Sequence, residues 1–237
     1  MNTEPEVVPI KCPHCGRPAV QRTLIVLGME KTLVFCNKCA PQVEVKSDFP
    51  MMPREAGLPE RLIDETMDDF KVDEKNRNVY EWYKTFISAL NDKIKSGQSV
   101  FLTGRYGTGK TKIATDIFKR CLELGYRGRV LNNGEIRFNL NKYAMDGYEK
   151  SAWISKYRAV RLLFWDDIGQ GKLTDSQIDF YYQVINYRYD NRLPTLFTSH
   201  TNSEELSGII GEENLSRILG MCQGNVIKIE GDDRRIK

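Results

Sequence analysis

Short apolar runs alternate with helical stripes over most of the chain. Residues 78–94 carry apolar side chains at helical spacing, and helices are also predicted over 110–124 and 175–190. Between and after them lie apolar runs typical of strands, at 100–103, 129–131, 162–165, 194–199 and 226–229. Strands separated by helices predict an α/β fold, with a five-stranded parallel sheet covered on both faces.

The first 75 residues follow another pattern. Four prolines and a glycine between positions 41 and 59 indicate a linker. Residues 60–70 have helix-compatible spacing within an acidic stretch, since 54–75 holds eight acidic and four basic residues. We therefore expect a small module at 1–45, a linker with an acidic helix at 46–75, and the main domain at 76–237.

The composition is that of a soluble globular protein. The chain has 237 residues, of which 41% are hydrophobic, and 35 basic against 32 acidic residues give a net charge of +3. These values argue against the disordered and collagen-like classes. No apolar stretch approaches the roughly 18 residues of a membrane helix, and the N-terminus lacks a secretory signal pattern. We expect a cytoplasmic protein, or a nuclear one if the host has a nucleus.

Four of the six cysteines form two close pairs near the N-terminus. The spacing C-x2-C-x20-C-x2-C is typical of a structural zinc ribbon, in which two tight turns complete a tetrahedron of thiolates around Zn²⁺. The apolar stretch between the pairs suits a β-hairpin; a disulfide or redox role is the alternative. Cys121 and Cys222 stand apart and are expected to be packed thiols. The zinc ligands would be Cys12, Cys15, Cys36 and Cys39.

A glycine-rich loop follows the predicted strand at 100–103 and precedes a helix. Its sequence matches G-x-x-x-x-G-K-[ST], in which backbone N–H groups and the helix N-terminus bind phosphates. Lys110 would lie between the β- and γ-phosphates of ATP, and Thr111 would offer its hydroxyl to Mg²⁺. A glycine-rich turn ending by chance in Lys-Thr is the alternative. The predicted nucleotide-binding residues are Gly104, Arg105, Tyr106, Gly107, Thr108, Gly109, Lys110 and Thr111.

Two adjacent carboxylates end the apolar run at 162–165. Asp166 would coordinate Mg²⁺, and Asp167 would polarise the water that attacks the γ-phosphate. The alternative is a strand that ends in a polar turn. Many ATPases of this class carry Glu at the second position, and the shorter Asp167 predicts slow hydrolysis.

Basic and aromatic residues are interleaved between positions 117 and 161. This stretch holds ten basic and four acidic residues, and such a pattern suits binding of single-stranded DNA through charge and base stacking. The alternative is a solvated helix face whose aromatic residues belong to the core. Our candidates for DNA contacts, on the pore side of an assembly, are Arg137, Lys142 and Lys150.

Four stretches, GLPERLIDETMDDF, FLTGRYGTGKT, LLFWDDIG and INYRYDNRLPTLFTSHT, carry a family resemblance over about residues 56–237. The chain resembles the AAA+ replicative helicase loaders of the DnaC/DnaI type and their relative IstB, the transposition helper ATPase. The resemblance implies an AAA+ P-loop NTPase core without a C-terminal lid, here preceded by the small zinc-binding module with its four cysteines. It also implies an ATPase that assembles into an oligomer.

The resemblance also implies roles for residues outside the loop. The strand at 194–199 leads to a sensor position that is usually Asn; His200 stands there, with Asn202 two residues on, and a surface histidine is the alternative. Arg217, in a Ser-Arg-Ile element, would reach the nucleotide of a neighbouring subunit, and Arg188 and Arg192 are weaker candidates for that role. The zinc module would grip the replicative helicase.

The leading hypothesis is therefore an ATP-dependent helicase loader that binds the replicative helicase and single-stranded DNA during replication initiation. An IstB-like helper of a DNA transposase, acting on duplex DNA, shares the same core. A weakly hydrolysing or non-hydrolysing adaptor, in which ATP is a structural ligand, also fits the departures at Asp167 and His200. A small-molecule kinase fits least, because no lid or acceptor motif appears in the sequence.

Overall fold

The computed structural model describes residues 8–11, 18–26, 29–35 and 50–234. The chain divides into two compact units, Met1–Lys46 and Ser47–Lys237. In the first unit, β1 (Val8–Lys11) pairs antiparallel with β2 (Pro18–Val26), which pairs antiparallel with β3 (Met29–Phe35). The β2–β3 register runs from Val20↔Phe35 to Val26↔Met29, so the predicted hairpin is present. The four cysteines of the predicted zinc ribbon lie outside the described residues.

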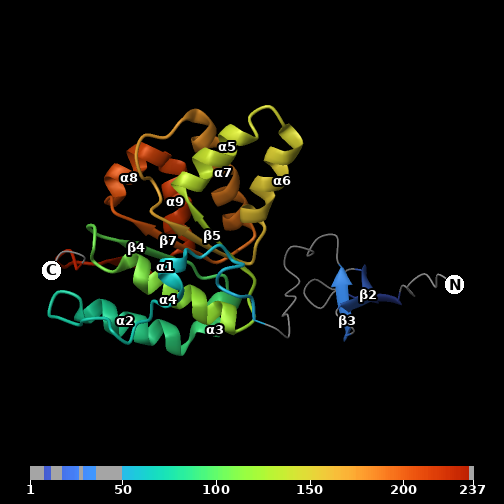
Figure 1. The fold of residues 1–237 in the computed structure, drawn as a ribbon, viewed down its shortest axis with the longest axis horizontal. Helices are drawn as coiled ribbons and strands as arrows, with labels where there is room; N and C mark the ends of the chain where they lie inside the picture. The colour runs from blue at the N-terminus through green and yellow to red at the C-terminus, as the bar shows by residue number, and fades with distance from the viewer. Residues whose placement is uncertain (1–7, 12–17, 27–28, 36–49, 235–237) are drawn as a thin grey trace. The chain divides into compact units, whose positions relative to one another are not determined.

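The second unit is built on a parallel five-stranded sheet in the order β5-β6-β7-β4-β8. This confirms the sheet predicted from the apolar runs. Figure 1 shows helices on both of its faces. The strands are β4 (Val100–Thr103), β5 (Gly128–Asn132), β6 (Leu162–Asp166), β7 (Thr195–Ser199) and β8 (Val226–Lys228).

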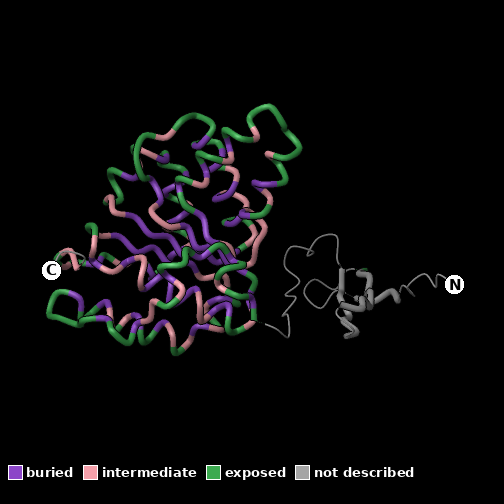
Figure 2. Tube along the Cα trace, in the orientation of Figure 1, coloured by how far each residue is buried: buried purple, intermediate pink, exposed green. Residues whose placement is uncertain are grey.

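Alternating side chains of the central strands serve two separate cores. On β6, Leu162 and Phe164 face one core while Leu163 and Trp165 face the other, as expected for a sheet buried on both faces. The buried segments in Figure 2 follow these strands. The first core is covered by α1 (Glu60–Ile63), α2 (Arg77–Ser88), α3 (Leu90–Lys95) and α4 (Lys110–Glu123). The second is covered by α5 (Asn133–Lys142), α6 (Gly147–Arg158), α7 (Asp175–Asp190), α8 (Ser203–Ile210) and α9 (Glu212–Met221).

Two predicted helices differ from the observed ones. The helix over 78–94 is broken at Ala89, whose φ of −115° and ψ of 19° are not helical, and α3 then keeps Leu90 and Ile94 buried. The acidic helix over 60–70 is only α1, one turn long, and Met67 and Phe70 reach the core from the turns that follow it.

The stretch that the prolines indicated as a linker packs onto the main domain from residue 51 onward. Met51, Ala56 and Leu58 are buried in the first core. The N–H of Val130 on β5 donates to the carbonyl of Ala56 at 2.8 Å. Residues 50–75 are therefore part of the folded unit, and they lie beside the loop that follows β4.

Candidate functional site

The predicted phosphate loop joins β4 to α4. Gly104, Gly107 and Gly109 all have positive φ (146°, 72° and 102°), which side chains other than glycine rarely adopt. Lys110 is buried at 5% exposure, and its Nζ donates to the carbonyls of Gly104 and Arg105 at 2.8 and 2.7 Å. The lysine is thus held across the loop, and the N-terminus of α4 points its free N–H groups at the same place.

Asp166 ends β6 beside this loop and accepts two hydroxyl hydrogen bonds. Thr111 donates to its Oδ1 at 3.0 Å and Thr198, on the neighbouring strand β7, at 2.7 Å. Burial, followed by the nearby charge of Asp167, raises the pKa of Asp166 above its usual range, while the two hydroxyls lower it. The structure therefore brings together Thr111 and Asp166, the two residues predicted to hold Mg²⁺.

These donors fit a hard cation of the magnesium type. A hydroxyl and a carboxylate oxygen supply two oxygen ligands, and Mg²⁺ in nucleotide sites takes its other ligands from water and phosphate. Within the described residues no three His, Cys, Asp or Glu side chains cluster as a metal cage. The site accordingly suits a metal that arrives with a nucleotide.

Asp167 has a strained backbone. Its φ of 52° lies in the left-handed region, and its N–H donates to Thr198 Oγ1 at 2.8 Å. The Thr198 hydroxyl, fully buried, thus bonds both acidic residues. Non-glycine residues held in this region cluster at functional sites, and Asp167 lines the cavity described next.

A cavity of about 530 Å³ extends from the phosphate loop, a size typical of small-molecule sites. Lys110, Thr111 and Asp167 line it together with residues of the 50–75 segment and of the chain after β8, which the sequence pattern did not indicate. The lining residues are Arg61, Leu62, Glu65, Asp69, Phe70, Lys71, Tyr106, Gly107, Gly109, Lys110, Thr111, Lys112, Asp167 and Arg234.

The two sensor candidates are in different settings. The ring of His200 stacks on Tyr106 of the phosphate loop, with 4.6 Å between centroids, and its buried Nδ1 has no hydrogen-bond partner among the described residues. Asn202 caps α8: its side chain accepts from the Glu205 N–H at 2.8 Å in a capping box. Of the two, His200 is the one beside the loop.

The three candidate arginines lie in different environments. Arg217, on α9, pairs with Glu213 at 2.6 Å, lies over the Tyr182 ring, and does not line the cavity of its own chain. Arg188 is 0% exposed and is enclosed by backbone carbonyls, so it cannot reach a neighbouring subunit. Arg192 lies after α7 and is exposed.

The DNA candidates lie on α5 and α6. Arg137 and Lys142 line the outer side of α5, and Lys150 on α6 is half-buried. Near them in the sequence, Phe138 (66%) and Tyr148 (82%) are exposed, whereas Trp153 and Tyr157 are buried in the second core. Some of the interleaved aromatic residues are therefore core, and two are available at the surface.

The lone cysteines are packed thiols. Cys121 and Cys222 are both 0% exposed, and burial raises the pKa of each thiol. Neither lines the cavity. Both thus belong to the cores, as predicted from the sequence.

The family model of the IstB-like ATP binding proteins matches residues 59–237. The chain belongs to this family. Its predicted kinship with DnaC-like AAA+ proteins is thereby confirmed, and the core of this IstB-like chain is an ATP-binding domain. None of the described helices is long and apolar enough to cross a membrane.

Curated relatives match about two thirds of the chain. The uncharacterised protein YqaM of Bacillus subtilis (strain 168) is 33% identical over 165 residues, which are 64% of this chain and 48% of YqaM. The replicative helicase loader DnaI of the same organism is 24% identical over 170 residues, 66% of this chain and 53% of DnaI. The IstB-like chain thus spans about half the length of these relatives.

Solved structures share the fold. A crystal structure of the DnaC helicase loader has a TM-score of 0.64 at 22% identity and covers 73% of this chain and 100% of its own. AMPPCP-bound DnaA from Aquifex aeolicus has a TM-score of 0.59 at 23% identity, covering 71% and 50%. At these identities the likeness shows the fold alone.

Proposed function

We propose that this IstB-like chain is an ATP-dependent helicase loader that hydrolyses ATP slowly. The observation that carries the ATPase assignment is the arrangement of Thr111, Asp166 and Thr198 beside the phosphate loop, with Asp167 lining the cavity. The loader assignment rests on similarity to DnaI, which is named a replicative helicase loader, and on the fold shared with DnaC.

Each residue of the site has a separate role in ATP hydrolysis. Lys110 and the loop N–H groups hold the phosphates, and Thr111 and Asp166 would hold Mg²⁺, which would neutralise phosphate charge. Asp167 orients a water whose oxygen attacks the γ-phosphorus while the bond to the ADP oxygen breaks, giving ADP and inorganic phosphate. His200 contacts the γ-phosphate or the water.

The ATPase assignment is tested with full-length variants. Lys110→Ala should abolish nucleotide binding, whereas Asp167→Asn should keep binding and lose hydrolysis. Binding without hydrolysis in the wild-type chain would instead support the adaptor, in which ATP is a structural ligand.

Arg217 acts in trans in this proposal. Mixing Arg217→Ala, which keeps an intact ATP site, with Asp167→Asn, which keeps the arginine, should then restore part of the ATPase activity. Each variant alone should be inactive. If the mixture stays inactive while both variants bind ATP and assemble, the assignment is refuted.

The DNA assignment predicts that Arg137→Ala/Lys142→Ala/Lys150→Ala weakens binding of single-stranded DNA and flattens its salt dependence. Fluorescence anisotropy of a labelled oligonucleotide measures both. The matched control removes the same charge from exposed lysines elsewhere, at Lys84, Lys95 and Lys172. If both triple variants weaken DNA binding equally, the effect comes from the lower net charge and not from contacts of these three residues.

The N-terminal module is proposed to bind one Zn²⁺ through Cys12, Cys15, Cys36 and Cys39 and to contact the replicative helicase. Metal analysis should find one zinc per chain, lost in Cys12→Ser/Cys15→Ser. That variant should lose co-elution with the helicase but keep nucleotide binding. Helicase capture that survives the loss of zinc would refute the contact role.

A helper of a DNA transposase is the second candidate, because the matching family is itself described as IstB-like. The two functions differ in the nucleic acid. ATP-dependent assembly on duplex DNA, without a complex with the helicase, would favour the transposition helper.

A further inference from the structure

The chain crosses the phosphate loop again after β8. The N–H of Arg234 donates to the carbonyl of Gly107 at 3.2 Å, and the Asp233 side chain packs where a side chain of residue 107 would otherwise lie. We call residues 232–234 the strap. Its sequence, Asp-Asp-Arg, matches no nucleotide-binding motif.

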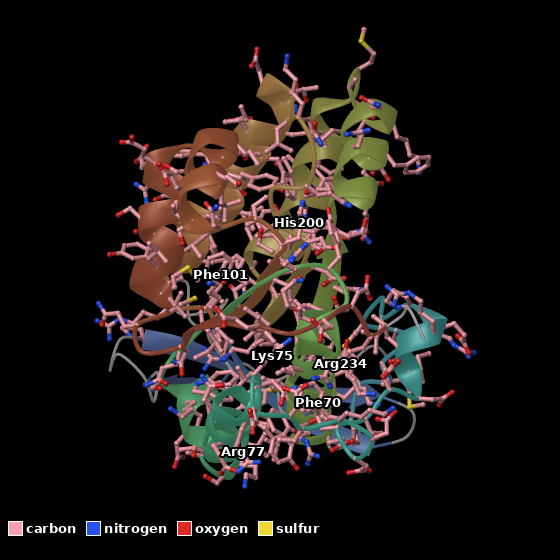
Figure 3. The ribbon with its side chains drawn as sticks, turned by 90° about the vertical axis from the view of Figure 1, so that its left-hand side faces the viewer. Phe70, Lys75, Arg77, Phe101, His200 and Arg234 are labelled. Atoms are coloured by element: carbon pink, nitrogen blue, oxygen red, sulfur yellow. The ribbon has the colours of Figure 1, made fainter. Side chains whose placement is uncertain are left out.

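The Arg234 side chain ties the strap to the 70–75 segment. Its guanidinium lies 4.9 Å from the ring centroid of Phe70, donates to the carbonyl of Lys71, and pairs with Asp73 at 3.0 Å. On the exposed side, Lys75 Nζ bonds Asp232 at 3.2 Å. Figure 3 shows Phe70, Lys75 and Arg234 on the same side of the molecule.

Phe70 connects these contacts to the phosphate loop. A Cβ at Gly109 would lie only 2.9 Å from Phe70 Cε2, so the ring rests directly on the loop where glycine leaves room. Its ring also stacks on Tyr80, with centroids 6.1 Å apart. Phe70 is 8% exposed and is therefore held between Arg234, Tyr80 and Gly109.

The cavity is lined by two chemically different groups of residues. Phosphates belong at Lys110 and Thr111, so Leu62, Phe70 and Arg234 are left to contact the base and ribose of a bound nucleotide; we call these three residues the base end. This inference rests on the proposed function: we propose that the strap closes the base end in cis. In this arrangement Arg234 is a positioning residue that holds Phe70 as the wall against which the base packs. The Arg234 side chain is 26% exposed and lines the cavity.

The proposal predicts weaker nucleotide binding when Arg234 is changed. Arg234→Ala should weaken ATP and ADP by similar factors of about five to ten, the size of one partly desolvated cation–π contact. The loss should be in the dissociation rate. Arg234→Lys should recover part of it, because lysine keeps the charge but not the planar contact with the ring and the paired hydrogen bonds.

The test is equilibrium binding and dissociation of a fluorescent ATP and ADP analogue with the full-length chain. Lys95→Ala is the matched control, because it removes a cation at an exposed position outside both the strap and the cavity. A double-mutant cycle with Phe70→Ala asks whether Arg234 acts through the ring. If it does, the two losses are markedly less than additive.

Each outcome decides between the alternatives. Wild-type affinity in Arg234→Ala, or the same loss in Lys95→Ala, overturns the strap while leaving the ATP site intact, provided that Lys110→Ala abolishes binding. Full additivity with Phe70→Ala overturns the positioning role. If the wild-type chain binds no nucleotide, the proposed function falls and the strap with it. Unchanged thermal unfolding of Arg234→Ala without nucleotide excludes a general folding defect as the cause of weaker binding.

Discussion

The hydroxyl of Thr198 is the group that joins the two acidic residues of the site, so Thr198→Val is the most informative substitution. Valine keeps the shape of the side chain and removes only the hydroxyl. That hydroxyl accepts the Asp167 N–H at 2.8 Å and donates to Asp166 Oδ1 at 2.7 Å. Thr198 is 0% exposed, so water cannot simply replace it.

The magnitude follows from the two lost bonds. An orphaned N–H costs about 1–3 kcal/mol and a hydrogen bond to a charged group contributes about 1.5–3 kcal/mol. Asp167 is half-buried, and partial access of water to its N–H reduces the sum. We expect the free energy of unfolding to fall by about 2–4 kcal/mol, measured by urea denaturation.

The same change has a pH signature. The Thr198 hydrogen bond lowers the pKa of Asp166, which burial and Asp167 raise, so the variant raises this pKa further. Mg²⁺ needs the ionised carboxylate. On acidification, Mg²⁺-dependent nucleotide binding should therefore be lost at a higher pH in Thr198→Val than in the wild type.

Ser199→Ala is the control for Thr198→Val. It removes a buried hydroxyl from the next position of β7, one that donates to the Ile168 carbonyl and does not bond either acidic residue. The control should leave the pH of half-maximal binding unchanged. If Thr198→Val destabilises by less than about 0.5 kcal/mol, below the usual cost of a lost bond, and shifts no pH profile, the reasoning is wrong.

Four further substitutions test other parts of the structure. Arg188→Met should lower the free energy of unfolding by about 3–5 kcal/mol, because the carbonyls around the buried guanidinium lose their donor; an unchanged urea midpoint would contradict this. Asn202→Ala should cost about 1 kcal/mol as a lost helix cap without changing ATPase rate, whereas His200→Ala should slow ATPase with little change in stability. If Asn202→Ala instead slows ATP hydrolysis and His200→Ala does not, the sensor role belongs to Asn202. Lys112→Met should loosen the acidic segment over α4 and weaken nucleotide binding severalfold; binding equal to wild type would show that its ion pairs are dispensable.

The sheet and the phosphate end of the site could be predicted because local pattern determines them. The apolar runs specify strands buried on both faces, and the carboxyl ends of parallel strands meet at one edge, which places Asp166 beside Thr111. The role of Thr198 was missed, although its position indicates it. Thr198 is a polar residue near the carboxyl end of a predicted strand, the edge of the sheet where Asp166 also lies. No feature of the sequence indicates that Arg188 is buried, because an arginine in a helix is most often solvated. The carbonyls that surround it come from the end of α6 and from the residue before β7, which pack against α7.

The acidic stretch was predicted together with the linker because prolines and a glycine precede it. Its net negative charge has no compensation within the stretch itself. The compensation comes from α4, the helix that follows the phosphate loop. Lys112 pairs with Glu65 at 2.5 Å and with Asp69 at 2.6 Å, and Lys119 donates to the carbonyls of Ile63 and Glu65 at 2.6 and 2.8 Å.

Composition shifts measured along the chain cannot detect pairing between residues about 50 positions apart. Yet this pairing decides the shape of the site. The N-terminal end of α4 is expected to bind phosphates, and two lysines of the same helix hold the segment that supplies Leu62 and Phe70 to the base end of the cavity. Because one rigid helix carries both groups of contacts, displacement of the acidic segment should be felt at the base end before it is felt at the phosphate end. Weaker binding of the whole nucleotide, with little change in the affinity for inorganic phosphate alone, is the result that this geometry requires when Lys112 is changed.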